Sequence, residues 1–412
     1  MKKVTLPDGR MIKGGWVAPP NAAYGGVDFI CDQSFYDVKE SGVNLLFPYV
    51  DPVREPEDFA RYVSYCKKYN VYTMATDHRF ADPEADEREL AAAAEYYRST
   101  GVVFGVSVCD EPGRKKFSVL SDCYKKYKKL LGNLCFYINH MPMYAGCSQI
   151  NGGWWTGSGA EPESTTEEYS LFIDDFCSAI DIPVLSYDFY PFRWEKGVPD
   201  KRYYEQLVVC REKAEKYDRS LWNFTQLTSW NRDYIRNTEY TEIAWLNNTS
   251  LAFGVVGLQY FCYWTPTDAG GEKFLSAMIT RDGKRTKHYA YVKKLNAELS
   301  RIESFFLKAE HKGVVVQGDA GCSVPESKIV LSSFGALEYI DSCGVIVGCF
   351  NYEGKNMYYV VNGSPVSYRT AELRFTKEIR ADVYEHGRKC EMIAKDFSLV
   401  LDGGEGVLIV EK

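Results

Sequence analysis

The feature that most constrains the fold of this chain is a regular alternation between short apolar runs and amphipathic segments. The apolar runs before residue 265 cover residues 43–50, 71–75, 102–108, 134–138, 182–185, 221–224 and 255–263. Near-continuous apolar runs of this length are typical of strands that are buried on both faces, as in a parallel sheet. The segments between them place apolar residues at helical spacing, for example at Phe59, Tyr62, Val63 and Cys66. The alternation therefore predicts repeated strand–helix units.

The predicted strands end at regular intervals. We place their C-terminal ends near Ala18, Val50, His78, Glu111, His140, Asp188, Gln226 and Trp264. Each interval is long enough for a helix, a strand and two loops. Eight such units in about 250–300 residues predict an α/β fold, the (β/α)8 TIM barrel, whose site lies at the C-terminal ends of the strands. The doubly wound alternative would need a glycine-rich fingerprint after its first strand, and the sequence has none.

The pattern changes after about residue 312. Short apolar runs are there separated by turn residues every ten positions or so, which is typical of a small all-β sandwich. We therefore predict a (β/α)8 catalytic barrel over residues 1–310 and a C-terminal β-sandwich over residues 311–412. The last helix of the barrel is predicted over about residues 286–307.

Charge and hydropathy exclude several classes of function. The chain has 412 residues and a net charge of −7, which argues against a dedicated nucleic-acid-binding protein. No window approaches the roughly 18–20 apolar residues of a membrane span, so we expect neither nucleic acid nor a membrane as a partner. The 13 cysteines are odd in number and scattered, which predicts reduced thiols and a cytoplasmic protein. A secreted protein whose signal peptide has been removed would leave the same sequence.

Aromatic residues are abundant, and with 31 Tyr, 22 Phe and 8 Trp we expect some rings to line a site for a flat-faced ligand. In a barrel the strand ends meet at one mouth, so polar and aromatic residues there are the candidates for a site. These candidates are Asp77, His78, Asp110, Glu111, Asn139, His140, Tyr187, Asp188, Tyr190, Gln226, Trp230, Tyr263 and Trp264.

The end of the fourth predicted strand carries two adjacent carboxylates, Asp110 and Glu111, followed by Pro112. Carboxylates at the end of an apolar strand cost free energy unless they are paired or used, which makes them candidates for catalysis. The structural alternative is an acidic helix N-terminus ahead of Lys115 and Lys116.

The barrel order, the Asp110-Glu111-Pro112 ending of strand four and the Tyr263-Trp264 ending of strand eight resemble the (β/α)8 glycoside hydrolases. The resemblance covers roughly residues 12–310 and is closest to clan A and its β-galactosidase-like members. It implies that Glu111 is the general acid/base. It also implies that Asp110, where the clan usually has Asn, contacts the sugar 2-hydroxyl and that Trp264 forms an aromatic floor under the sugar.

The chain departs from the clan at strand seven, where the nucleophilic Glu is replaced by Gln226. An amide can donate and accept hydrogen bonds but cannot attack an anomeric carbon. Three explanations stay open: the second carboxylate lies elsewhere, the barrel is catalytically degenerate, or a Glu was replaced.

Asp188, at the end of strand six, is our candidate for the relocated second catalytic carboxylate. Two carboxyl groups about 5–5.5 Å apart imply retention of configuration, and a separation of roughly 6.5–9.5 Å implies inversion. The alternative is a structural partner of a nearby Arg or backbone amide. The stereochemical outcome therefore stays open.

The remaining strand-end residues are expected to bind substrate. Asp77, His78 and His140 could ligate a metal, but they lack metal-site spacing, so hydrogen bonding to sugar or core packing is expected and no metal or cofactor is predicted. Asn139 and Gln226 are polar candidates. The rings expected to stack on sugar are Tyr187, Tyr190, Trp230, Tyr263 and Trp264, together with Trp154 and Trp155 in the irregular stretch over residues 145–166.

These observations predict a glycoside hydrolase that cleaves a soluble oligosaccharide or glycoconjugate by two-carboxylate acid/base catalysis. A carbohydrate-binding protein on a degenerate hydrolase barrel is the first alternative, because of Gln226. A metal-dependent sugar isomerase or aldolase is the second. The sugar, the linkage and the oligomeric state stay open.

Overall fold

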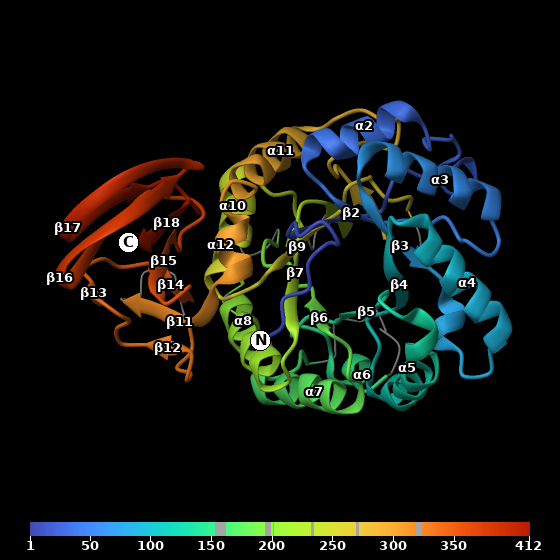
Figure 1. Cartoon of the computed structure of the whole chain (residues 1–412), viewed down its shortest axis with the longest axis horizontal. Helices are drawn as coiled ribbons and strands as arrows, with labels where there is room; N and C mark the ends of the chain where they lie inside the picture. The colour runs from blue at the N-terminus through green and yellow to red at the C-terminus, as the bar shows by residue number, and fades with distance from the viewer. Residues whose placement is uncertain (153–161, 194–198, 201, 232–234, 269–271, 318–323) are drawn as a thin grey trace.

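A closed barrel of eight parallel strands forms the first part of the chain (Figure 1). The computed structural model describes residues 1–152, 162–193, 199–200, 202–231, 235–268, 272–317 and 324–412. The barrel strands are, in order, β1 (Ile12–Trp16), β2 (Leu45–Phe47), β3 (Tyr72–Thr76), β4 (Val103–Asp110), β5 (Cys135–His140), β6 (Val184–Tyr187), β7 (Ser220–Gln226) and β9 (Gly257–Phe261). Parallel pairing of β1 with β9, in the register Ile12↔Gly257, closes the barrel. The predicted TIM barrel is confirmed.

Helices surround the barrel (Figure 1). The longer ones are α2 (Asp32–Ser41), α3 (Pro56–Tyr69), α4 (Glu87–Thr100), α5 (Phe117–Leu131), α7 (Thr166–Ala179), α8 (Arg202–Lys216), α10 (Tyr240–Ala252) and α11 (Lys287–Leu299). Shorter elements are α1 (Ala22–Gly25), α6 (Cys147–Ile150), α12 (Glu303–Lys308) and the 3-10 turns η1 (His78–Ala81) and η2 (Arg114–Lys116). On α3, the predicted apolar face of Phe59, Tyr62, Val63 and Cys66 is buried. Gly42 ends α2 in the left-handed conformation that favours glycine.

The predicted helix over residues 286–307 is two helices, α11 and α12. The chain leaves the helix at Ser300, whose hydroxyl donates to the Asn296 carbonyl at 2.8 Å. The buried Lys13 ammonium donates to Ser300 Oγ at 2.8 Å and to Glu303 at 2.6 Å. These contacts tie the residues between α11 and α12 to strand β1. Hydrogen bonds to another part of the fold therefore end the helix, although the apolar spacing of the sequence continues through this point.

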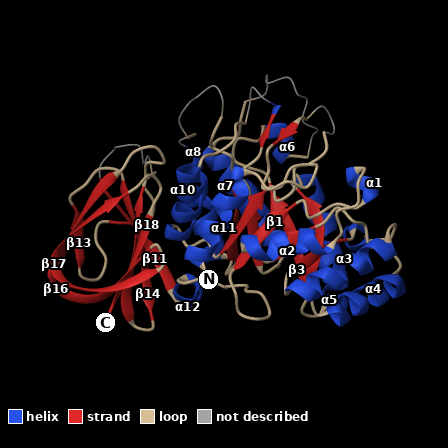
Figure 2. Ribbon diagram, turned by 90° about the horizontal axis from the view of Figure 1, so that it is seen from above, coloured by secondary structure: helices blue, strands red, loops and turns tan. Residues whose placement is uncertain are grey.

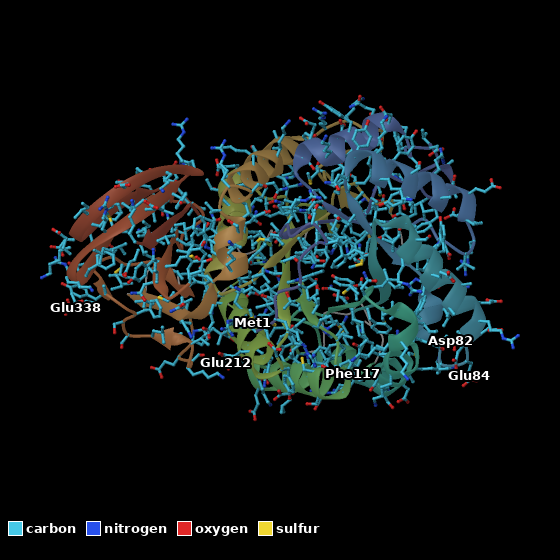
Figure 3. The ribbon with its side chains drawn as sticks, in the orientation of Figure 1. Met1, Asp82, Glu84, Phe117, Glu212 and Glu338 are labelled. Carbon is cyan, nitrogen blue, oxygen red and sulfur yellow. The ribbon has the colours of Figure 1, made fainter. Side chains whose placement is uncertain are left out.

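Side chains pack inside the barrel, and Figure 3 draws the side chains of the described residues over the ribbon. The interior cluster includes Phe104, Tyr137 and Trp222, with ring centroids 5.9 Å apart for Tyr137 and Trp222 and 6.3 Å apart for Phe104 and Trp222. Large rings leave no channel through the barrel, which is typical of this fold. Helix α6 lies beyond one end of the barrel and the N terminus lies toward the other end (Figure 2).

The C-terminal part is an all-β domain, as predicted. Its strands are β11 (Glu310–Gln317), β12 (Val330–Leu331), β13 (Leu337–Ile340), β14 (Val345–Tyr352), β15 (Lys355–Asn362), β16 (Arg369–Glu385), β17 (Arg388–Leu401) and β18 (Gly406–Glu411). They form one curled sheet in the order β12-β11-β14-β15-β18-β16-β13, with β17 paired to β16. Strand β17 escaped prediction because most of its side chains face solvent, so it carries no continuous apolar run.

The β domain lies beside the barrel against α10 (Figure 1). The Trp245 indole donates to the Gly363 carbonyl at 2.9 Å, and the Tyr359 hydroxyl donates to Asn248 at 2.7 Å. Among the described residues, no helix is both long enough and apolar enough to span a membrane, and every described cysteine is free.

Candidate active site

A cavity of about 990 Å³ opens at the C-terminal mouth of the barrel. Every barrel strand contributes at or near its C-terminal end, through Trp16, Phe47, Thr76, Asp110, Asn139, Asp188, Phe224 and Phe261. This is where barrel folds place their sites, and the volume lies in the range of pockets that bind small molecules.

Glu111 directly follows β4 and reaches the cavity from an uncommon backbone conformation. Its φ is 46°, in the left-handed region that non-glycine residues seldom adopt. Its backbone N–H donates to the Asn139 carbonyl at 2.9 Å, which ties the turn to β5. Backbone strain of this kind gathers at functional sites, where the surrounding structure holds it in place. The turn lets both Asp110 and Glu111 face the cavity.

The carboxyl groups of Glu111 and Asp188 face the same cavity and affect each other's pKa. Asp188 is 5% exposed, whereas Glu111 is open to the cavity but enclosed by its walls. This enclosure, with the charges of Asp188 and Asp110, raises the pKa of Glu111 well above its ordinary value. Burial and the charge of Asp110 also raise the pKa of Asp188, to about 8. Both shifts favour the protonated form of the carboxyl group.

A chain of hydrogen bonds fixes this pair from below. Asn139 Nδ2 donates to Asp188 at 3.1 Å, while Asn139 Oδ1 accepts from Ser186 Oγ at 3.0 Å. Ser186 Oγ lies 2.8 Å from the Tyr137 hydroxyl and accepts from Gln259 Nε2 at 2.9 Å. Because the Asn139 oxygen is occupied by Ser186, its amide N–H groups must face Asp188. The network thus sets the orientation of the Asp188 carboxylate.

Asp110 lies beside the pair. Enclosure raises the pKa of Asp110 to about 6, and a hydrogen bond from Asn139 partly opposes this shift. Asn139 therefore serves both Asp110 and Asp188, which places these two carboxylates on the same side of the cavity.

Gln226 takes a structural role in place of the expected substrate contact. Its Oε1 accepts from the Phe192 N–H at 3.0 Å, and its Nε2 donates to the carbonyls of Phe192 and Arg236, both at 2.8 Å. The side chain is fully buried and does not line the cavity. These three bonds join the segments that follow β6 and β7 and use both amide N–H groups of Gln226.

Two further polar candidates lie away from the cavity lining. Asp77 accepts from Arg79 at 2.8 and 2.9 Å and from the Tyr97 hydroxyl at 2.8 Å, so its carboxylate is used in a buried ion pair. His140 is enclosed, with its ring centroid 3.9 Å from that of Phe176, and burial lowers its pKa to about 3. Substrate binding by these two residues is not supported by their positions.

Three aromatic candidates are core residues rather than lining residues. Tyr187 and Tyr263 are fully buried, and Trp264 packs against Phe29 at a centroid distance of 4.7 Å. The expected floor at Trp264 is therefore corrected: β9 ends at Phe261, and Phe261 faces the cavity. Trp154 and Trp155 lie outside the described residues.

The structure brings the other candidates together at the cavity, and adds aromatic residues that sequence reasoning missed. The confirmed lining positions are His78, Asp110, Glu111, Asn139, Asp188, Tyr190 and Trp230. Additional rings are Trp16, Phe47, Tyr49, Tyr144, Phe224, Phe261 and Phe274. The ring centroid of Trp230 lies 5.0 Å from that of Tyr190 and 5.3 Å from that of Phe261. The ring centroids of Trp16 and Phe47 lie 5.0 Å apart. Trp16 could have been predicted as a lining residue from the sequence, because it ends the first strand.

Two more acids line the cavity, and both escaped prediction. Glu163 forms ion pairs with Arg193, at 3.3 Å, and with Arg202. Glu272 follows β9 in the chain and is half-buried, and this burial raises its pKa. It makes no hydrogen bond or ion pair with any described residue. Its charge contributes to the raised pKa of Glu111.

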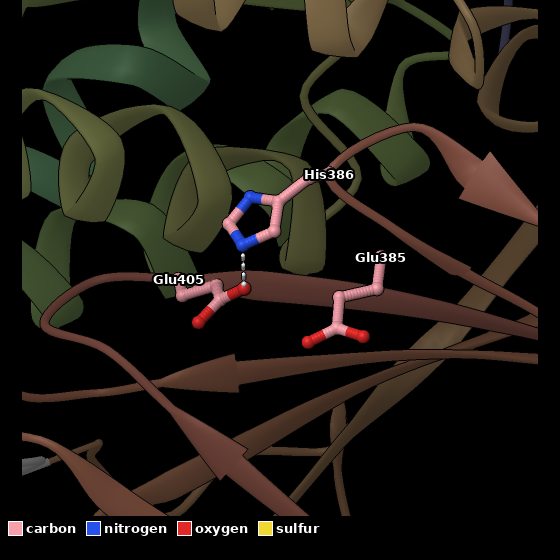
Figure 4. A group of neighbouring side chains, drawn as sticks. All are labelled: Glu385, His386 and Glu405. Carbon is pink, nitrogen blue, oxygen red and sulfur yellow. Dashed lines mark ion pairs between the residues drawn. The ribbon is translucent and has the colours of Figure 1, made fainter.

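The described cavity residues hold no group of ligands suited to a metal ion. Asp77, His78 and His140 are not among the described side chains whose ligand atoms lie close enough together to hold a metal ion, and the Asp77 carboxylate is paired with Arg79. Across the described chain, the close group of His and acidic side chains is Glu385, His386 and Glu405, whose ligand atoms lie within 4.8 Å of one another. Figure 4 shows His386 facing Glu405, with His386 Nε2 3.0 Å from the carboxylate. This group belongs to the β domain, away from the cavity.

Comparison with known proteins gives a likeness of fold alone. No family model matches the chain, and no curated protein matches it in sequence. A solved β-galactosidase from Bacillus circulans sp. alkalophilus has a TM-score of 0.63 at 9% identity, covering 98% of this chain and 99% of that one. A glycoside hydrolase family 5 structure from Bacteroides vulgatus has a TM-score of 0.56 at 9% identity, covering 100% and 91%. A maltogenic α-amylase from Thermotoga neapolitana has a TM-score of 0.51 at 12% identity, covering 97% and 98%. The chain therefore shares the barrel-plus-β-domain fold of these glycoside hydrolases.

Proposed function

We propose that this protein is a glycoside hydrolase acting on a soluble oligosaccharide or glycoconjugate, with Glu111 as the general acid. The observation that carries the proposal is the position of Glu111 in the cavity at the mouth of the barrel, where enclosure and the neighbouring Asp188 and Asp110 raise its pKa. Glycosidic cleavage needs a carboxyl group that is still protonated near neutral pH, so that it can protonate the leaving oxygen. The likeness of fold to glycoside hydrolases agrees with this chemistry but does not establish it.

Asp188 acts in this account as the residue that positions the Glu111 proton. Cleavage needs two carboxyl groups on opposite sides of the glycosidic bond, about 5–5.5 Å or 6.5–9.5 Å apart. Asp188 lies beside Glu111 in the cavity, its carboxylate accepts from Asn139, and its charge raises the pKa of Glu111. We therefore propose this supporting role for Asp188 in place of the role of second catalytic carboxylate.

Rings and polar groups on opposite sides of the cavity suit a saccharide. Trp16 and Trp230 offer flat faces on which the C–H surface of a sugar ring can stack. Asp110, Asn139 and His78 offer hydrogen-bonding groups to its hydroxyls. This combination of apolar faces and a few convergent polar groups is what binding a sugar requires.

The charge of the cavity favours a neutral saccharide. The described lining residues include the carboxylates Asp110, Glu111, Glu163, Asp188 and Glu272, and neither Lys nor Arg. Without a cation to neutralise it, a uronic acid or a phosphorylated sugar would meet like charges. We therefore propose neutral glycosides as the substrate class.

The test is turnover of aryl glycosides and natural oligosaccharides by the wild type and by Glu111→Gln. Glu167→Gln is the matched control, because Glu167 lies exposed on α7. We expect hydrolysis by the wild type and by the control, and a loss of about 100- to 10,000-fold in the Glu111 variant on natural substrates. Turnover by Glu111→Gln equal to that of the control would remove Glu111 from the mechanism.

A carbohydrate-binding protein without activity is the second candidate, favoured by Gln226 where the clan has its nucleophile. It predicts that calorimetry detects sugar binding while no member of the same panel is hydrolysed. Hydrolysis by the wild type at a rate that depends on Glu111 rejects this candidate.

A further inference from the structure

The described acids of the cavity differ in their freedom to act on a substrate. Asp188 accepts from Asn139 and lines the cavity beside Glu111, and Asp110 directly precedes Glu111 at the end of β4. Glu163 is neutralised by Arg193 and Arg202. None of these acids faces Glu111 from across the cavity as a free carboxylate.

Glu272 lies on the other side of the barrel mouth. In the circular strand order β1-β2-β3-β4-β5-β6-β7-β9, the strand four places from β4 in either direction is β9. Glu111 follows β4, and Glu272 belongs to the segment that follows β9. Both residues line the same cavity, and the strands that they follow lie opposite each other in the barrel order.

The backbone around Glu272 is anchored. Strand β10 (Phe274–Leu275) pairs with β8 (Ser229–Trp230), in the register Phe274↔Trp230. The Asn231 N–H donates to the Lys273 carbonyl at 3.1 Å, and the Lys273 N–H donates to Asn231 Oδ1 at 3.1 Å. The residue next to Glu272 is thus held by two bonds. The Glu272 side chain has no ion-pair partner among the described residues, which leaves its carboxylate free to meet a ligand.

We propose that Glu272 is the second catalytic carboxylate, acting on the anomeric carbon from the wall opposite Glu111. This inference rests on the proposed function. In the first step the anomeric C–O bond breaks, and the Glu111 proton passes to the leaving oxygen. If Glu272 is a nucleophile, its oxygen bonds to the anomeric carbon; water then displaces it, giving one proton back to Glu111. If it is a base, it takes a proton from the attacking water, and that proton returns to Glu111 through solvent. Both routes consume one water.

The position of Glu272 explains how a barrel with Gln226 can remain active. The residue is supplied by the segment after the eighth strand instead of by the seventh. Its negative charge also favours the protonated form of Glu111, because it contributes to the raised pKa of that carboxyl group. Removing the charge is therefore expected to lower the pKa of Glu111 as well as to remove the second carboxylate.

The experiment compares Glu272→Ala and Glu272→Gln with Lys273→Ala in the full chain. Lys273 is exposed, and its contacts to Asn231 use only its backbone, so its variant controls for disturbance of the segment. The substrate is the 2,4-dinitrophenyl glycoside that the wild type cleaves fastest. We expect kcat/KM to fall by about 1,000-fold or more in both Glu272 variants and to stay within about 3-fold in the control. Circular dichroism melting curves check that each variant is folded.

Azide separates a catalytic role from a structural one. A small anion can enter the space left by Glu272→Ala and attack the anomeric carbon in its place. We expect azide to restore turnover of this variant and to yield a glycosyl azide whose anomeric configuration, read by NMR, is opposite to that of the substrate. No restoration in a folded variant, or an azide product of retained configuration, would overturn the proposal. Full activity of Glu272→Ala would do the same.

The same panel distinguishes failure of this inference from failure of the proposed function. If the wild type hydrolyses no glycoside, both are wrong. If the wild type is active, Glu111→Gln is impaired and Glu272→Ala is as active as Lys273→Ala, only the role of Glu272 is wrong.

Discussion

Glu111 and Asp188 follow strands β4 and β6 and face the same cavity at the mouth of the barrel, where the charge of Asp188 contributes to the raised pKa of Glu111. In the proposed mechanism this relationship makes Glu111 the proton donor and Asp188 the group that favours its protonated form. The second catalytic carboxylate is proposed to come from the segment that follows β9.

Replacing Asp188 by Asn is expected to lower the pH at which activity is lost on the alkaline side. The Asp188 charge raises the pKa of Glu111, so its removal lowers that pKa and Glu111 loses its proton at lower pH. The measurement is kcat/KM against pH for the wild type and the variant, with Asp122→Asn on the surface of α5 as a control. If kcat/KM falls at the same alkaline pH in the wild type and in Asp188→Asn, Asp188 does not raise the pKa of Glu111.

Converting Gln226 to Glu is expected to destabilise the fold without improving catalysis. A carboxylate cannot donate to the carbonyls of Phe192 and Arg236, and it would be buried facing these oxygens with only the Phe192 N–H as a donor. We expect a loss of about 2–4 kcal/mol in the free energy of unfolding, measured by urea denaturation. A stable variant with higher kcat/KM would instead indicate that position 226 is a vacant nucleophile site.

Truncating Trp16 to Ala is expected to weaken sugar binding more than turnover. Trp16 lies at the end of β1 on the cavity wall, where its ring can stack on substrate. Loss of the ring should raise Kd for a bound saccharide about 10-fold, measured by calorimetry. Tyr368→Ala, on the exposed surface of the β domain, serves as the control. An unchanged Kd would place the sugar elsewhere in the cavity.

An acidic substrate is expected to be turned over more slowly than its neutral counterpart. The described lining has carboxylates and neither Lys nor Arg, so an aryl uronide should show kcat/KM at least about 10-fold below that of the matching neutral glycoside. Because salt screens charges, the difference should narrow as ionic strength rises. A preference for the uronide would reject the proposed substrate class.

The barrel was predictable because its strands are buried on both faces and so appear as apolar runs. Strands β5 and β7 end at His140 and Gln226, the positions near which their ends were predicted. The eighth strand of the barrel, β9, ends at Phe261 and not near Trp264. Cys262, Tyr263 and Trp264 are buried beyond the strand, so their hydrophobicity extended the apparent run.

The acids at strand ends were predictable for the same reason, since a carboxylate after an apolar run stands out. Glu272 was not, because it belongs to an irregular segment whose approach to the cavity depends on the pairing of β8 with β10. The approach of Glu111 to the cavity beside Asp188 was likewise not predictable from the sequence, since it depends on the turn of Glu111 at positive φ. Local patterns report burial, and they carry no information on which loops meet.

The role of Glu111 as the general acid is tested most directly by measuring how the activity of Glu111→Gln depends on the leaving group. A series of aryl glycosides that differ only in the acidity of the phenol isolates proton donation, because acidic phenols leave without a proton. The account predicts that Glu111→Gln retains activity on the dinitrophenyl glycoside and loses about 100-fold or more on the least acidic phenols, while the wild type varies little. An equal loss on every leaving group would contradict the assignment of Glu111 as the general acid.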